Sequence, residues 1–249
     1  TPLTLIEGYS NMLGEEVSAA NPRVGIVLGG IANGTRRLKE IIEDMIDVSM
    51  IDNNLLALNF QPVWLNQLLG ICRNELAEAL GERRHSLRIS DFPGSNHPLF
   101  ADPERLFQVF MNVLRNAIKY TPDGGKIIVS GRELPGFVEV TVADTGIGIP
   151  LERQQDIFEK FGSLGDVSLH SSGKTKFKGG GPGLGLPIAR GILEAHGGAI
   201  WVESSGYDEK ACPGSVFHLM IPVKEKLPET KVPKLFGLTD EEKKAMGLA

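Results

Sequence analysis

Residues 102–120 read DPERLFQVFMNVLRNAIKY, and their apolar spacing predicts one strong helix. Asp102 is suited to cap the helix N-terminus, and Pro103 is suited to the first helical position, where a missing N–H costs nothing. Residues 126–134 and 137–144 follow directly, alternate between apolar and polar side chains, and are joined by a Pro-Gly turn. A long amphipathic helix followed by a hairpin predicts an α+β fold.

The same helix carries a group of polar side chains near its end. Asn112 and Asn116 are four residues apart and therefore share one face, while Lys119 and Tyr120 come one turn later. Two amides, an ammonium group and an aromatic ring could hold a metal-bound polyphosphate and flank a base. They could equally form a polar face that meets only water.

A second cluster, DTGIGIP at 144–150, stands where the second strand of the hairpin ends. Glycines at positions 146 and 148 would let a ligand approach the backbone closely. Asp144 has an acceptor-only side chain, which suits an exocyclic amino group. The alternative is a turn that merely ends a strand.

A third cluster, GGGPGLGLPIAR at 179–190, leads into a predicted helix over 185–198. Glycine-rich backbone before a helix N-terminus is typical of phosphate binding. The cluster is neither a Walker nor a Rossmann pattern, because no Gly-Lys-Ser/Thr follows and no strand leads in. A flexible loop is the alternative.

The remaining patterns complete an α layer on one largely antiparallel, mixed sheet, which is a two-layer α/β sandwich. A further helix is expected over 66–82, and the further strands are expected over 85–90, 97–101, 199–205 and 215–223.

Ahead of this domain lie two helical patterns, over 1 to about 19 and 22 to about 57. The second has a heptad seam made of Val24, Leu28, Ile31, Thr35, Leu38, Ile42, Met45 and Ser49. The short link between them implies an antiparallel hairpin, and one hairpin buries little by itself. We therefore expect two copies to form a dimeric four-helix bundle, with a core separate from that of the second domain.

Composition narrows the classes of function. The 249 residues are 41% hydrophobic and 23% charged, typical of a globular protein, and the net charge of -5 argues against a nucleic-acid partner. Cys72 and Cys212 match no metal or redox spacing, which favours reduced thiols and a cytoplasmic location. No apolar run approaches the ~20 residues of a membrane helix, so any membrane attachment is expected only through segments upstream of the chain.

The order of the clusters is more specific than any one of them. N-x-x-x-N-A-x-K-Y, then D-x-G-x-G, then G-x-G-L-G-L resembles the ATP-binding domain of sensor histidine kinases, within the Bergerat-type ATPases and kinases, over roughly residues 60–223. The residues that this resemblance assigns to ATP binding are Asn112, Asn116, Lys119, Tyr120, Asp144, Gly146, Ile147, Gly148, Lys178, Gly181, Gly183, Leu184, Gly185 and Leu186.

The resemblance also implies individual roles. Asn116 would be the Mg²⁺ ligand, Lys119 would meet phosphate, and Tyr120 would lie beside the adenine. Asp144 would accept a hydrogen bond from the adenine amino group, and the glycines near 146 and 183 would admit the ligand. No catalytic residue is assigned within the chain.

Part of the chain departs from the family pattern. Phe158 and Phe161 would anchor a lid, but this lid lacks an arginine, so Lys174, Lys176 and Lys178 would serve the γ-phosphate. Pro182 replaces the usual threonine or serine and removes one backbone donor.

By the same resemblance, Thr1-Pro2-Leu3 is a remnant of the phosphoacceptor box, with the acceptor histidine just upstream of Thr1. The expected organisation is a dimerisation and histidine-phosphotransfer hairpin at 1–58, an ATP-binding domain at 59–223 and a tail at 224–249. The expected partners are a second copy, through the hairpin, and a response-regulator receiver domain.

Two rival functions remain open at this point. An ATPase or serine kinase of the same superfamily typically has a glutamate where this chain has Asn112. A nucleotide-binding signalling scaffold would change conformation without transferring phosphate.

Overall fold

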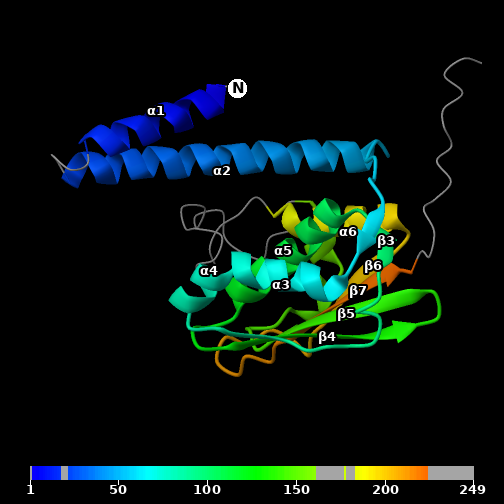
Figure 1. Cartoon of the computed structure of the whole chain (residues 1–249). Coiled ribbons are helices and arrows are strands. Elements are labelled where there is room, and N and C mark those ends of the chain that lie inside the picture. The colour runs from blue at the N-terminus through cyan, green and yellow to red at the C-terminus, as the bar shows by residue number, and fades with distance from the viewer. Residues whose placement is uncertain (1, 18–21, 161–176, 178–182, 224–249) are drawn as a thin grey trace, which may run out of the picture.

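A computed structural model describes residues 2–17, 22–160, 177 and 183–223, and all structural statements below concern these residues (Figure 1). The helices are α1 (Pro2–Val17), α2 (Pro22–Asp52), α3 (Leu65–Glu75), α4 (Ala77–Glu82), α5 (Pro103–Tyr120) and α6 (Gly185–His196). The strands are β1 (Gln61–Val63), β2 (Ser86–Ile89), β3 (Leu99–Ala101), β4 (Lys126–Leu134), β5 (Phe137–Asp144), β6 (Ala199–Glu203) and β7 (Ser215–Pro222). Two short 3-10 turns, η1 (Leu151–Arg153) and η2 (Asp156–Phe158), follow β5.

Five strands form the main sheet in the order β2-β4-β5-β7-β6, and β1 pairs with β3 in a separate ribbon. Only β2 and β4 are parallel, while the other three pairings of the main sheet are antiparallel. This confirms the predicted mixed, largely antiparallel sheet. The bounds of β4 and β5 are those predicted from their alternation, because a half-buried strand leaves its period in the sequence.

Helices α3, α5 and α6 cover one face of this sheet (Figure 1). The sheet turns alternate side chains toward them, and those of Ile127, Val129, Val140, Val142 and Leu219 are almost completely buried. Burial of each such side chain stabilises the fold by about 1.5–3 kcal/mol. The core of the second domain therefore lies between the α layer and the sheet, as the two-layer pattern predicts.

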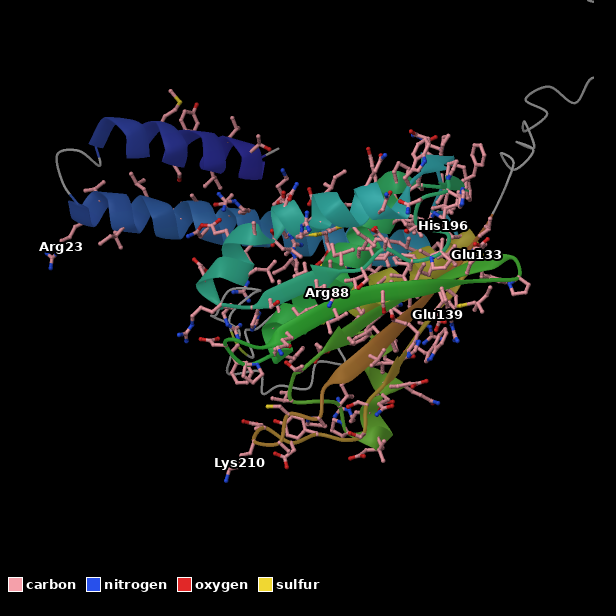
Figure 2. All side chains as sticks on the ribbon, turned by 60° about the horizontal axis from the view of Figure 1, so that its bottom comes forward. Arg23, Arg88, Glu133, Glu139, His196 and Lys210 are labelled. Atoms are coloured by element: carbon pink, nitrogen blue, oxygen red, sulfur yellow. The ribbon has the colours of Figure 1, made fainter. Side chains whose placement is uncertain are left out.

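The opposite face of the sheet carries polar side chains, among them Glu139 (Figure 2). Its carboxylate accepts from Arg132 and from His218 Nδ1, the latter at 2.7 Å, and Trp201 stacks on the His218 ring. Arg132 is the main reason that the pKa of Glu139 lies below its usual range, with His218 second.

Helices α1 and α2 form the expected antiparallel hairpin, but α2 ends at Asp52 and not near residue 57. Asn54 adopts a left-handed conformation (φ 54°), and Leu55 N–H donates to Met50 O at 2.8 Å. This hydrogen bond across a left-handed residue is a common helix stop, and asparagine tolerates it better than most residues.

The end of α2 packs on the second domain. Val48 and Ile51 contact its core, and Gly191 of α6 makes room, since a Cβ there would lie 2.4 Å from Ile51 Cγ2. Asp47 accepts from Arg105 Nη1 (2.7 Å) and from Gln108 of α5. The expectation of separate cores is therefore wrong at this end of the hairpin.

The structure differs from the sequence expectations in three further ways. The helix expected over 66–82 is two helices, because the Leu76 backbone leaves the helical region (φ -93°, ψ 1°). Strand β1 was not expected, and β6 ends at Glu203 and not at residue 205. The tail at 224–249 lies outside the described residues.

Candidate functional site

The second half of α5 presents the predicted amide pair. The Asp102 carboxylate caps this helix by accepting from Glu104 N–H and Arg105 N–H, both at 3.1 Å, as the sequence predicts. Asn112 and Asn116 are half-buried, and Asn112 Nδ2 donates to Gly185 O of α6 at 3.0 Å. The first amide of the pair therefore ties α5 to the start of α6.

The C-terminal end of α5 is tied to the D-x-G-x-G segment. Ile147 N–H donates to Tyr120 O at 3.1 Å. Lys119 Nζ lies 4.7 Å from the centroid of the Tyr120 ring, a cation–π contact. The structure therefore brings Lys119 and Tyr120 together beside residue 147, whose side chain is buried.

Asp144 ends β5 and is half-buried. Its Oδ1 accepts from Gly146 N–H at 2.8 Å, and the backbone N–H of Ser215 is its second donor. Burial raises the pKa of Asp144 to about 6, against the lowering effect of these two hydrogen bonds. A buried carboxylate with lone pairs left over can accept a further hydrogen bond from a ligand amino group.

The glycines of D-x-G-x-G are needed by the protein's own backbone. A Cβ on Gly146 would lie 2.6 Å from Tyr120 O, and one on Gly148 (φ +74°) would lie 2.0 Å from Gly206 O. Two other chain segments therefore approach these glycines closely, and the close approach of a ligand stays a prediction.

The start of α6 completes the arrangement. Gly183 has φ +71°, and a Cβ on Gly185 would lie 3.3 Å from the Asn112 side chain. The side chains of Leu184 and Leu186 are buried, so these two predicted residues face the core and not solvent. Lys178 and Gly181, like Phe161 and the lysines at 174 and 176, lie outside the described residues. Phe158 is buried and packs edge-on against Phe217.

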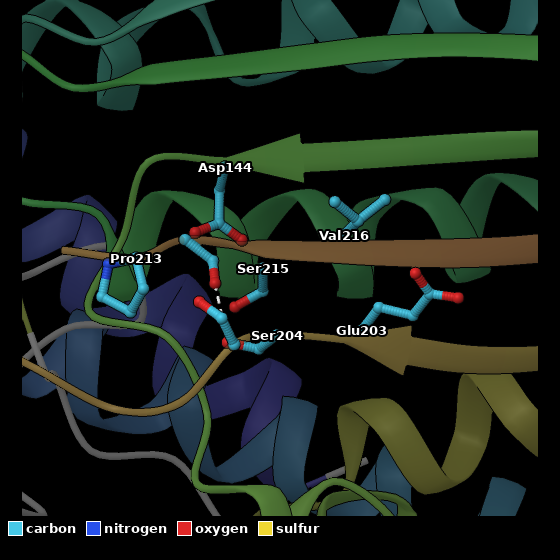
Figure 3. A pocket seen from close by; sticks show the side chains of 8 residues that line it. Asp144, Glu203, Ser204, Pro213, Ser215 and Val216 are labelled. Carbon is cyan, nitrogen blue, oxygen red and sulfur yellow. Dashed lines mark hydrogen bonds between the residues drawn. The ribbon is translucent and has the colours of Figure 1, made fainter.

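A pocket of about 370 Å³ lies beside Asp144 (Figure 3). Of the predicted residues only Asp144 lines it, together with Glu203, Ser204, Ser205, Pro213, Gly214, Ser215 and Val216. These residues flank or form the connection between β6 and β7, which the sequence analysis did not assign to the site. The pairing of Asp144 with Ser215 depends on the strand register, which no local pattern reveals.

Comparison with known proteins matches residues 101–225 to the family of histidine kinase-, DNA gyrase B-, and HSP90-like ATPases. The chain belongs to this family. Its matched region contains α5, the D-x-G-x-G segment and α6, which are the three segments that meet in the candidate site. The resemblance inferred from the order of the motifs is thereby confirmed.

Relatives of this ATPase-family chain are sensor histidine kinases. The adaptive-response sensory kinase SasA of Synechococcus elongatus is 34% identical over 189 residues, which are 76% of this chain and 45% of SasA. The fold matches that of full-length ShkA in complex with AMPPNP, with a TM-score of 0.73, 23% identity and coverage of 92% of this chain and 44% of ShkA. It also matches histidine kinase ThkA in complex with response regulator protein TrrA, with a TM-score of 0.59, 24% identity and coverage of 90% and 58%.

The chain spans less than half the length of the curated relatives that it matches. Within its described residues, no helix has both the length and the apolar character needed to cross a bilayer.

Proposed function

We propose that this chain is the catalytic core of a two-component sensor histidine kinase. It would bind Mg-ATP and transfer the γ-phosphoryl group to a histidine upstream of Thr1, from which the group passes to a response-regulator aspartate. The observation that supports this most is the half-buried Asp144 carboxylate, which binds Gly146 N–H close to the C-terminal end of α5.

The residues present fit an adenine nucleotide. Asp144 offers an acceptor to the adenine amino group, and a low-polarity environment strengthens such a bond. Tyr120 supplies an aromatic ring, and Lys119 supplies a positive charge for phosphate. The ShkA structure was solved with AMPPNP, an ATP analogue, which agrees with this assignment.

A magnesium ion fits the same site. Mg²⁺ favours hard oxygen ligands and is usually bound through substrate phosphates with few protein groups. Asn116 would supply its amide oxygen from the half-buried face of α5. When bound, the ion would neutralise charge on the phosphates during transfer, while the chain positions the nucleotide.

The hairpin fits a dimerisation and phosphotransfer domain at 1–58, ahead of the ATP-binding domain at 59–223. In a single chain, Ile31, Leu38, Ile42 and Met45 of the seam remain 41–51% exposed. A second copy would cover this apolar surface in a four-helix bundle. The complex of ThkA with a response regulator supports a receiver domain as the further partner.

The rival activity, an ATPase or serine kinase, has less support. A base that activates water or a hydroxyl needs a titratable group, and an amide has none. At the position concerned this chain has Asn112, whose side chain is held by Gly185 O.

The test is incubation with γ-labelled ATP. A chain extended upstream by about six of its natural residues should acquire an acid-labile, base-stable label, while the 249-residue chain without this extension should acquire none. Four of its five histidines lie in the described part of the ATP-binding domain, away from the hairpin. Label on neither chain despite nucleotide binding would favour the scaffold, and release of phosphate alone would favour an ATPase.

A further inference from the structure

The connection between β6 and β7, residues 204–214, packs along the D-x-G-x-G segment. Asp208 N–H donates to Ile147 O and Gly214 N–H donates to Gly146 O, both at 2.9 Å. Gly148 forms an isolated β-bridge with Tyr207. Successive residues of the D-x-G-x-G segment are thus held by this one connection. Lys210, in the connection, lies far from the hairpin (Figure 2).

The Ser204 hydroxyl links the β6–β7 connection to the D-x-G-x-G segment. Ser204 Oγ accepts from Ile149 N–H at 3.0 Å and donates to Gly214 O at 2.7 Å, with Gly206 O 3.0 Å away. Figure 3 shows Ser204 near the end of β5, which carries Asp144, and the start of β7, which carries Ser215. Ile149 is buried, and the Ser204 oxygen is the partner described for its N–H.

These contacts lead directly to the Asp144 carboxylate. Its two donors are the N–H groups of Gly146 and Ser215. Gly214 N–H donates to the carbonyl of Gly146, the residue whose own N–H is the first donor, and Gly214 precedes Ser215 in the chain. Because Ser204 holds Gly214, it fixes the position of both donors and hence the direction in which the carboxylate accepts.

We propose that Ser204 is a positioning residue for base recognition, acting through Gly214 and Ile149 on Asp144. The proposal rests on the proposed function, since it requires Asp144 to recognise a base amino group. Loss of the hydroxyl would leave the phosphate-binding groups of α5 and α6 in place. It would therefore weaken discrimination between bases more than binding of the triphosphate.

The test compares ATP with ITP, which carries the same triphosphate but lacks the amino group. The preference for ATP is the dissociation constant of ITP divided by that of ATP. In the Ser204→Ala chain this ratio should fall about threefold to tenfold, which corresponds to the free energy of one hydrogen bond. The amide proton of Ile149 should also exchange faster. Ser130→Ala is the matched control, because Ser130 loses a hydroxyl bond to Thr141 (2.8 Å) in the same sheet without touching this segment.

The outcomes are distinguishable. If the unmodified chain binds no ATP, the proposed function fails. If the unmodified chain prefers ATP to ITP, and the Ser204→Ala and Ser130→Ala chains show the same ratio of ITP to ATP dissociation constants, the positioning role is wrong. Should Ser204→Ala fail to fold, Gln154→Ala replaces it, because Gln154 Nε2 donates to Ser204 O (2.7 Å) and Ile149 O (3.3 Å). An unchanged ratio in that variant would also overturn the proposal.

Discussion

Asp144 is a carboxylate whose surroundings favour its neutral form. Burial raises its pKa to about 6, and the only donors described for it are two backbone N–H groups, with no cation among its described partners. A donor on a ligand would replace the lost water and favour the ionised form. This is the pattern expected of a recognition residue and not of a structural ion pair.

The pH dependence of binding follows from that shift. The ionised form of Asp144 is needed to accept from the amino group, and protons compete for it below a pKa of about 6. ATP affinity relative to ITP should therefore be constant above pH 7 and fall about tenfold for each further pH unit below pH 6. Fluorescence titrations with both nucleotides from pH 5 to pH 8 measure the ratio. A ratio independent of pH would contradict the role of Asp144.

At the scale of elements, the sequence predicted those helix and strand boundaries that depend on interactions between neighbouring residues. The bounds of β4 and β5, the cap at Asp102 and the left-handed Gly197 that ends α6 all follow from period and capping. The break at Leu76 and the three-residue β1 with Pro62 leave too weak a pattern to be seen.

The residues of the candidate site also fall into those that the local sequence indicated and those that it did not. Asn112 and Asp144 could be named from the sequence because their spacing and neighbours are informative. Ser204 and Ser215 could not, since the β5–β7 register brings Ser215 beside Asp144 over a long sequence separation. The backbone contacts of Gly146 and Gly148 were not predicted either, because a sequence does not show which chain segment approaches a glycine.

The hairpin carries a prediction about assembly. Leu38→Glu with Ile42→Glu places charges on the exposed seam and should convert a dimer to a monomer at tens of micromolar. Lys39→Glu with Glu43→Lys, on exposed positions off the seam, is the control with unchanged net charge. Light scattering gives the mass. A monomer before any substitution would show that the seam does not pair two copies, while ATP binding should survive in every variant.

On the scale of the whole molecule, α2 is both part of the hairpin and a support for the ATP-binding domain. Asp47 is buried and holds Arg105 and Gln108, and Asp52 pairs with Lys160 just after η2. Helix α2 lies between α1 and the rest of the molecule (Figure 1). Movement of the ATP-binding domain relative to the hairpin would have to break these contacts.

Asp47→Ala should therefore weaken the contact between the hairpin and the ATP-binding domain. It leaves the Arg105 guanidinium, with 26% of the side chain exposed, without its carboxylate. We expect a loss of about 1–3 kcal/mol in the free energy of unfolding and faster amide exchange at the end of α2. Glu43→Ala, one turn earlier at an exposed position of the same helix, is the control. Equal stability of the two variants in urea would show that the contact does not hold the parts together.

The central claim is that Asp144 recognises the adenine of a bound ATP, and calorimetric titration with Mg-ATP tests it most directly. Asp144→Asn keeps the shape but removes the charge and replaces one acceptor oxygen by an amide donor, so affinity should fall by about 2–3 kcal/mol, roughly a hundredfold. Asp91→Asn, at an exposed aspartate outside the site, should bind as the unmodified chain does. Equal affinity of the Asp144→Asn chain and the unmodified chain would contradict the account.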